Sequence, residues 1–155
     1  MKPILLSTDG SPTAARATTF AIELAEATGW PLHVLCAWAM PVTYFGEIPD
    51  EKLAKLRRTS HENAANVVQG AVDAAEKRGV EAEGNVVYGD PVTEICAAAQ
   101  DAQLVILGAH GWGPVKRLVY GSVSSSVLHE APCPVLVVRA DVEAVAEIPT
   151  FLASA

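Results

Sequence analysis

Apolar and polar residues follow two alternating periodicities along this chain. Five short apolar runs, typical of buried strands, occupy residues 3–8, 32–38, 82–88, 104–107 and 135–139. Between them, apolar residues recur every three to four positions at about residues 12–28, 50–78, 91–101 and 122–130. This second spacing places apolar side chains on one side of a helix. The pattern therefore predicts five strands separated by four helices.

Local start and stop signals support these helices. Ser11 and Asp90 are residues that cap helices, and each is followed by a proline, which favours the first helical position. Gly29 and Gly79 follow the first two periodic segments, where helices commonly end. For the long second helix, the spacing predicts an inner side made of Leu53, Leu56, Ser60, Ala64, Val67, Val68, Ala71 and Ala75.

Strands that alternate with helices form βαβ units, so the sequence predicts an α/β fold with a doubly wound, five-stranded parallel sheet and helices on both faces. Two connections look specialised: the DGS turn at 9–11 and the glycine-rich loop at 108–122. Ligands of such sheets bind beyond the carboxyl ends of the strands. If both connections serve one ligand, strands one and four are neighbours, as in the strand order 3-2-1-4-5. We expect one domain over residues 1–140 and a tail at 141–155.

The glycine-rich loop carries the clearest chemical signal. Gly108, Gly111 and Gly121 have the spacing G-x2-G-x9-G, and Ser122 follows at once and opens the last helix. Glycines let a ligand approach backbone N–H groups, and the amino end of a helix attracts anions, most often phosphate. Neither the P-loop string GxxxxGK[ST] nor the dinucleotide fingerprint GxGxxG is present. The alternatives are that the glycines only turn the chain and that Ser122 is only a helix cap.

Two further residues near these connections have more than one interpretation. Asp9, in the DGS turn, is either a residue of an Asx turn or a ligand contact. His110 is the one residue of the loop that could act as an acid or a base. Because no carboxylate partner is obvious in the sequence, we interpret His110 as a loop residue or a phosphate contact. The sequence therefore predicts no catalytic residue.

Composition excludes several functional classes. The formal net charge of −7 argues against a surface that binds nucleic acid. The three cysteines form no CxxC pair, and neither a zinc site nor a disulfide framework is expected. No apolar run approaches the ~20 residues of a membrane span, and we recognise no signal peptide. We expect a cytoplasmic protein that does not interact with membranes.

Several motifs together resemble those of the universal stress protein family, specifically its ATP-binding branch. The G-x2-G-x9-G-[ST] spacing is followed by VLHEAPCPVLVV, and ILLSTDGS and GDPVTEI occur earlier in the chain. The resemblance covers about residues 2–140. It implies the 3-2-1-4-5 sheet, a homodimer formed through the last strand, and ATP bound at the ends of the first and fourth strands.

The resemblance also assigns roles to individual residues. Asp9 would face the ribose or a phosphate-bound Mg²⁺, and the backbone of Ala37 would contact the adenine. The remaining predicted contacts, to the ribose and phosphates, are Gly108, Gly111, Gly121, Ser122, Val123 and Ser124. ADP or a cyclic nucleotide is an alternative ligand.

Three functions remain open on this basis. The first is an ATP-binding stress or signalling protein with little or no catalysis, which is our prediction. The second is an enzyme of related architecture, a slow ATP phosphohydrolase or an adenylyl-transfer enzyme; positioning and charge do most of the work in phosphoryl transfer, so a phosphate cradle could support some turnover. The third is an interaction module that binds no nucleotide, which the intact glycine spacing disfavours.

Overall fold

The computed structural model describes residues 1–39, 49–109 and 122–139 of the chain. Strands and helices alternate as the periodicities predict. The elements are β1 (Ile4–Ser7), α1 (Pro12–Thr28), β2 (Leu32–Trp38), α2 (Asp50–Glu76), β3 (Ala82–Tyr88), α3 (Pro91–Ala98), a 3-10 turn (Ala99–Asp101), β4 (Leu104–Gly108), α4 (Ser122–Glu130) and β5 (Val135–Val138). The predicted helix over residues 91–101 is thus α helix only to Ala98, because its last turn tightens, as helix ends commonly do.

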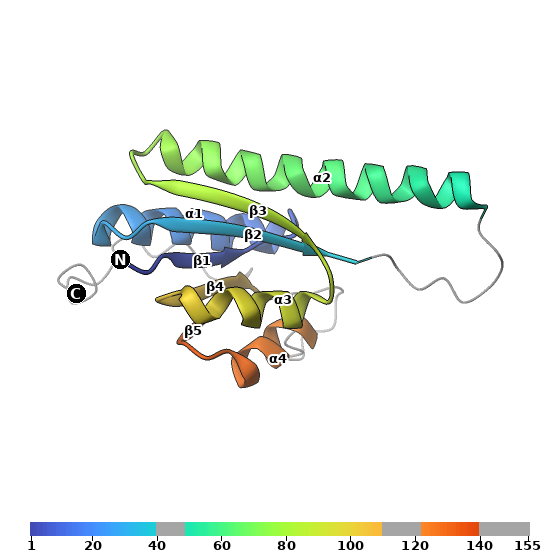
Figure 1. Ribbon diagram of the computed structural model, residues 1–155. Helices are drawn as coiled ribbons and strands as arrows, with labels where there is room; N and C mark the ends of the chain where they lie inside the picture. The colour runs from blue at the N-terminus through green and yellow to red at the C-terminus, as the bar shows by residue number, and fades with distance from the viewer. Residues whose placement is uncertain (40–48, 110–121, 140–155) are drawn as a thin grey trace.

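The five strands form one parallel sheet in the order β3-β2-β1-β4-β5, which confirms the predicted topology (Figure 1). Strand β1 lies in the centre, with β2 on one side and β4 on the other. Ser7, the last residue of β1, is in register with Leu35 of β2 and Leu107 of β4. The carboxyl ends of the two strands that precede the specialised connections therefore lie side by side.

Helices cover both faces of the sheet, and each face has its own apolar cluster. On one face, Ala21 of α1 and Val68 of α2 pack with strand residues such as Leu6. On the other face, Ile95 of α3 and Val127 of α4 pack with strand residues that include Leu5 and Leu35. Because both faces are buried, the central strands are apolar at successive positions, and Ile4, Leu5 and Leu6 are fully buried.

The long helix α2 differs from the prediction in how much of it is buried. Its buried residues are Ala64, Val68, Ala71, Val72 and Ala75, all in its second half. The predicted inner side also included Leu53, Leu56 and Ser60, but Leu56 is 39% exposed and the other two are only partly buried. In Figure 1 the first half of α2 extends past the carboxyl ends of β2 and β3. The periodicity was correct for a helix, but most of its first half extends beyond the sheet, and only the end of β2 reaches it, where Trp38 packs near His61.

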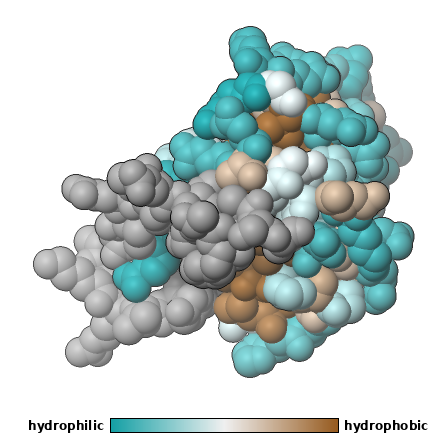
Figure 2. Space-filling model, turned by 90° about the vertical axis from the view of Figure 1, so that its left-hand side faces the viewer, coloured by the Kyte–Doolittle hydropathy of each residue, from teal (hydrophilic) through white to brown (hydrophobic). Residues whose placement is uncertain are grey.

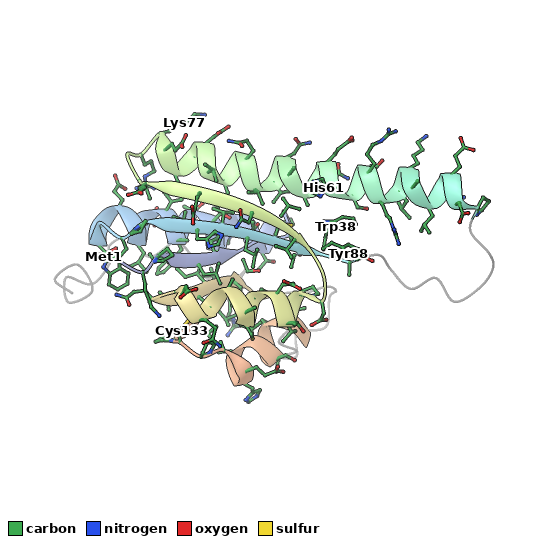
Figure 3. The ribbon with its side chains drawn as sticks, in the orientation of Figure 1. Met1, Trp38, His61, Lys77, Tyr88 and Cys133 are labelled. Carbon is green, nitrogen blue, oxygen red and sulfur yellow. The ribbon has the colours of Figure 1, made fainter. Side chains whose placement is uncertain are left out.

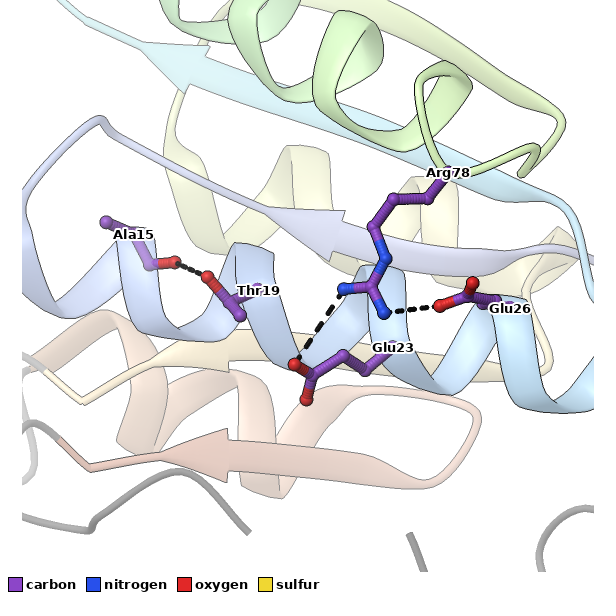
Figure 4. Close-up of polar contacts among 5 residues, drawn as sticks. All are labelled: Ala15, Thr19, Glu23, Glu26 and Arg78. Carbon is purple, nitrogen blue, oxygen red and sulfur yellow. Dashed lines mark hydrogen bonds and ion pairs between the residues drawn. The ribbon is translucent and has the colours of Figure 1, made fainter. Parts of the chain in front are cut away.

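The turn after α2 is attached to α1 by an ion-pair cluster (Figure 4). The Arg78 guanidinium approaches Glu23 with Nη1 3.8 Å from Oε1, and its Nη2 contacts the Glu26 carboxylate. All three side chains are at least 30% exposed, so the cluster contributes little to stability. Its effect is to join two neighbouring helices on the same face of the sheet.

Figure 2 views the end of the molecule where the strands begin. Hydrophilic residues surround separate hydrophobic areas on the described surface there. No helix within the described residues is long and apolar enough to cross a membrane.

Candidate functional site

A cavity of about 210 Å³ opens at the carboxyl ends of the central strands. This position agrees with the general rule for ligand sites in open α/β sheets. Its wall combines polar residues from the end of β1 with apolar residues from the neighbouring strands and helices. The lining residues are Ser7, Thr8, Asp9, Ala14, Ala37, Pro91, Ile95, Leu107, Gly108 and Val123.

The turn after β1 forms the polar side of the cavity. The Ser11 N–H donates to Asp9 Oδ1 at 2.9 Å, and the Gly10 N–H donates to the buried Thr8 hydroxyl at 3.3 Å. Gly10 has φ +76°, a conformation that favours glycine. Ser11 then caps α1, because its hydroxyl accepts from the Ala14 N–H at 3.2 Å. The Asx-turn interpretation of Asp9 is therefore confirmed, and Asp9 also lines the cavity.

Gly108, at the end of β4, allows two backbone segments to approach closely. A Cβ atom at this position would lie 2.9 Å from the Thr13 carbonyl carbon and 3.0 Å from the Ala14 nitrogen. Both atoms belong to the first turn of α1, which a side chain would displace. Gly108 is required for packing β4 against α1, whether or not it contacts a ligand.

Three helices begin beside the cavity. Ala14 of α1, Pro91 of α3 and Val123 of α4 all lie in the first turns of their helices, and all three line the wall. Asp90 caps α3 by accepting from the Thr93 N–H at 3.0 Å and from its hydroxyl at 2.9 Å. Each helix presents the positive end of its dipole at its amino terminus. The cavity is therefore a favourable place for an anion, although the whole chain is acidic.

The structure brings several of the predicted site residues together. Asp9, Ala37, Gly108 and Val123 come from four different elements and all line the cavity. Ser122 begins α4, as predicted. Ser124 is only 3% exposed and is not one of the lining residues described here. The remaining predicted residues, His110, Gly111 and Gly121, lie outside the described residues.

Sequence analysis missed six lining residues. Ser7 and Thr8 end the first strand, and their place beside the DGS turn was an available signal. Pro91 belongs to the GDPVTEI motif, which indicated a helix start and contributed to the family resemblance but assigned no ligand contact. The others, Ala14, Ile95 and Leu107, are ordinary apolar residues of helices and strands. Only the tertiary fold identifies these three as part of a cavity wall.

Metal-binding capacity at the cavity is limited to one carboxylate among the described residues. No three His, Cys, Asp or Glu side chains gather there or elsewhere in residues 1–39, 49–109 and 122–139. Asp9 is the acidic residue of the described wall. Mg²⁺ that is bound to nucleotide phosphates commonly uses only one or two protein carboxylates. Asp9 is therefore the one residue of the described wall that could serve as a ligand to such an ion.

Comparison with known proteins agrees with this architecture. Residues 1–139 match the universal stress protein family. The chain is 38% identical over 141 residues to a universal stress protein of Thermus aquaticus, covering 89% of this chain and 98% of that protein. The family match includes every strand and helix described above.

Solved structures give the same result. Universal stress protein UspA from Lactobacillus plantarum superimposes with a TM-score of 0.77 at 26% identity, covering 89% of this chain and 97% of that one. A universal stress protein from Archaeoglobus fulgidus, solved in complex with dAMP, has a TM-score of 0.59 at 25% identity, covering 89% of this chain and 98% of that one. With its 3-2-1-4-5 sheet and its motifs, this chain belongs to the universal stress protein family.

Proposed function

We propose that this protein binds an adenine nucleotide, ATP together with Mg²⁺, and acts as a nucleotide-binding stress or signalling protein with little or no catalysis. The observation that carries the proposal is the cavity at the ends of β1 and β4, where Asp9, Ala37, Gly108 and Val123 meet. The sequence predicts the same four residues as ligand contacts, and they are far apart in the chain.

The two sides of the cavity suit the two parts of a nucleotide. Ala37, Ile95 and Leu107 are among the apolar residues that can contact a flat base. On the polar side, the groups at Ser7–Asp9 suit a ribose, and the helix amino ends suit phosphate oxygens. The Archaeoglobus fulgidus relative that was solved with dAMP supports an adenine nucleotide as the ligand class.

Little catalysis is proposed because the described wall contains no pair of acid–base groups. Asp9 is the one acidic or basic side chain of the described wall, and general acid–base chemistry needs a group positioned at the reacting atoms. The alternative, a slow phosphohydrolase or an adenylyl-transfer enzyme, predicts turnover. Brisk loss of ATP that disappears in the His110→Ala variant would favour that alternative.

The same proposal extends to assembly and location. We propose a homodimer formed through β5, which is an edge strand whose four residues, Val135–Val138, are all only partly buried. A bare apolar edge favours pairing with a second strand. Light scattering that reports a monomer at micromolar concentrations would contradict the homodimer. We place the protein in the cytoplasm on the basis of its composition.

Filling the cavity tests the nucleotide site directly. Ala37→Phe adds a ring to the wall that is proposed to contact adenine, so ATP should no longer fit. We expect isothermal titration calorimetry to show micromolar or tighter binding by the wild type, which is the range set by about −0.3 kcal/mol per heavy atom of ATP. For Ala37→Phe we expect affinity to fall at least about a hundredfold.

Ala27→Phe is the matched control, because Ala27 is exposed on α1 away from the cavity wall. This variant should bind ATP like the wild type. Thermal melts without ligand show whether both variants are folded. If folded Ala37→Phe binds ATP as tightly as the control, the nucleotide is not bound in this cavity.

A further inference from the structure

A row of exposed polar residues runs along one side of α2. The spacing of the row is three, four, seven, four and three residues, which keeps its members on one side of a helix. The row consists of Lys55, Arg58, Glu62, Gln69, Asp73 and Glu76, and all six are exposed. The two basic residues lie toward the amino end, and the three acidic residues follow. The order of charges along the helix is therefore basic and then acidic.

The position of this row follows from the glycines beneath α2. A Cβ atom at Gly10 would collide with Val67, so this side of α2 faces the turn between β1 and α1. A Cβ atom at Gly84 would collide with Val68 and would approach Val72, so these residues face β3. Each residue turns the helix by about 100°. Asp73 and the rest of the row therefore point outward past β3, which is the edge strand of the sheet.

The first half of α2 lacks the packing that normally stabilises a helix. Residues 50–63 contain no buried residue, although they form about 21 Å of helix. Helices of this length are marginal in water without tertiary contacts. Within this half, Arg58 Nε lies 3.9 Å from Glu62 Oε1. Because the two side chains are 74% and 63% exposed, this ion pair adds little to the stability of the helix. Pro49 provides no side-chain cap.

An exposed aromatic residue lies at the carboxyl end of β3, beneath α2 (Figure 3). Tyr88, the last residue of β3, is 56% exposed and packs edge-on against Trp38, with ring centroids 4.9 Å apart. The Trp38 ring also packs near His61 of α2, with ring centroids 6.0 Å apart (Figure 3). Tyrosine is one of the residue types enriched among the anchors of protein interfaces. This side of the molecule thus combines charge with an accessible aromatic ring.

We propose that α2 packs antiparallel against α2 of a second copy of this chain, across a two-fold axis that passes beside Ala65 and Asn66. In that arrangement Lys55 faces Glu76 of the partner subunit, and Arg58 faces Asp73 of the partner subunit. Glu62 faces Gln69 of the partner subunit. The two small central residues let the helices approach, and each Tyr88 lies against the opposite helix.

The order of charges along the row indicates that its binding partner is a second copy of this chain. A partner for this row must carry acidic and then basic charges at the matching helical spacing. The same helix, when reversed by a two-fold axis, supplies this order, as isologous interfaces require. The row lies at the β3 edge, and β5 forms the opposite edge of the sheet. Association through α2 is therefore independent of pairing through β5 and of the nucleotide cavity.

Charge reversal tests this interface by sedimentation velocity on the full chain, from micromolar to near-millimolar concentrations. The wild type should show a concentration-dependent increase in mass that high salt suppresses. Lys55→Glu with Arg58→Glu, or Asp73→Lys with Glu76→Lys, should weaken this association about a hundredfold, because the two oppositely charged facing pairs both become like-charged. Mixing the two variants should restore it, since each now carries the charges that complement the other.

Lys52→Glu with Arg57→Glu is the matched control, because it makes the same charge change on other sides of α2. It should associate like the wild type. The test variants place acidic residues nearer the amino end of α2 and basic residues nearer its carboxyl end, which agrees with the helix dipole, so they should fold. Association through β5 is unaltered in all variants. The proposal is overturned if the mass of the wild type does not increase with concentration. It is also overturned if the test variants associate like the wild type, or if the two variants do not associate when mixed.

Discussion

Single residues near the cavity show that glycines serve different physical needs. Gly10 adopts φ +76°, so it is required for its backbone conformation as well as for its contact with Val67. Gly108 is not one of the positive-φ glycines described, and the requirement there is space beside Thr13 and Ala14. The sequence motif includes Gly108 as a ligand contact. The structure adds that this glycine is needed for folding, so its presence alone does not demonstrate phosphate binding.

Gly108→Ala should destabilise the protein by about 1–3 kcal/mol, because the added methyl group meets backbone atoms that cannot move independently. The midpoint of thermal unfolding should fall by roughly 2–12 °C. Gly70→Ala is the control, since Gly70 lies within α2 and a Cβ there meets nothing within 4 Å. That change should stabilise the protein by about 0.5–1 kcal/mol. Equal melting temperatures for the two variants would contradict the packing role of Gly108.

Cys36, next to Ala37 in β2, should be an unreactive thiol. Burial, together with a smaller effect of the Asp9 charge, raises its pKa from 9.0 to about 11. In a chain with Cys96→Ser and Cys133→Ser, alkylation at pH 8 should be very slow. Asp9→Asn should lower the Cys36 pKa, but only in part, because the thiol stays buried. Rapid alkylation of the folded protein at pH 8 would contradict this prediction.

At the scale of elements, the caps of α1 and α3 were predictable because they depend on neighbouring residues. Ser11 and Asp90 accept the expected backbone hydrogen bonds, each ahead of a proline. The burial of α2 was not predictable in the same way. Its apolar spacing is regular from Leu53 onward, but burial also requires a strand beneath the helix. The position of the strand ends is a property of the assembled sheet.

The cap of α3 should make stability depend on pH. Hydrogen bonds from Thr93 lower the Asp90 pKa below its ordinary value of 3.8. A carboxylate with a lowered pKa stabilises the folded state above its unfolded pKa and loses this effect as the pH falls through its folded pKa. Asp90→Ala should therefore lower the melting temperature at pH 7, and the deficit should shrink below about pH 3.8.

Asp90→Asn is the control for this prediction, because asparagine also caps helices but does not titrate. It should melt close to the wild type at pH 7. Thermal melts followed by circular dichroism between pH 7 and pH 2.5 would make the comparison. A deficit for Asp90→Ala that is the same at every pH would show that the carboxylate charge is not involved.

At the scale of the whole molecule, ATP should stabilise the fold because its site is built from several elements. Ligand at about 1,000 times its dissociation constant adds about 4 kcal/mol to the free energy of unfolding. For a domain of this size, millimolar ATP with Mg²⁺ should raise the melting temperature by roughly 8–16 °C. EDTA or Asp9→Asn should reduce the increase. A melting temperature that does not change with ATP concentration would contradict the proposed function.

The predicted ligand contacts come from distant parts of the chain. The order of the strands in the sheet explains why Asp9, Ala37 and Gly108 line one cavity. The prediction that strands one and four are adjacent placed Asp9 beside Gly108, and the structure confirms this arrangement. Ile95 and Leu107 escaped prediction because an apolar residue in the core and one in a cavity wall have the same local pattern. Only the shape of the assembled fold distinguishes them.

The sequence by itself determined the alternation of strands and helices, the caps, and the class of fold, because these depend on periodicity and on contacts between near neighbours. Together with the glycine spacing, it also indicated where a ligand should bind. Tertiary structure alone decided which apolar residues line the cavity, why Gly108 lacks a side chain, and where α2 extends beyond the sheet. These features depend on the distances between elements that are remote in the chain, and such distances exist only after the sheet has assembled.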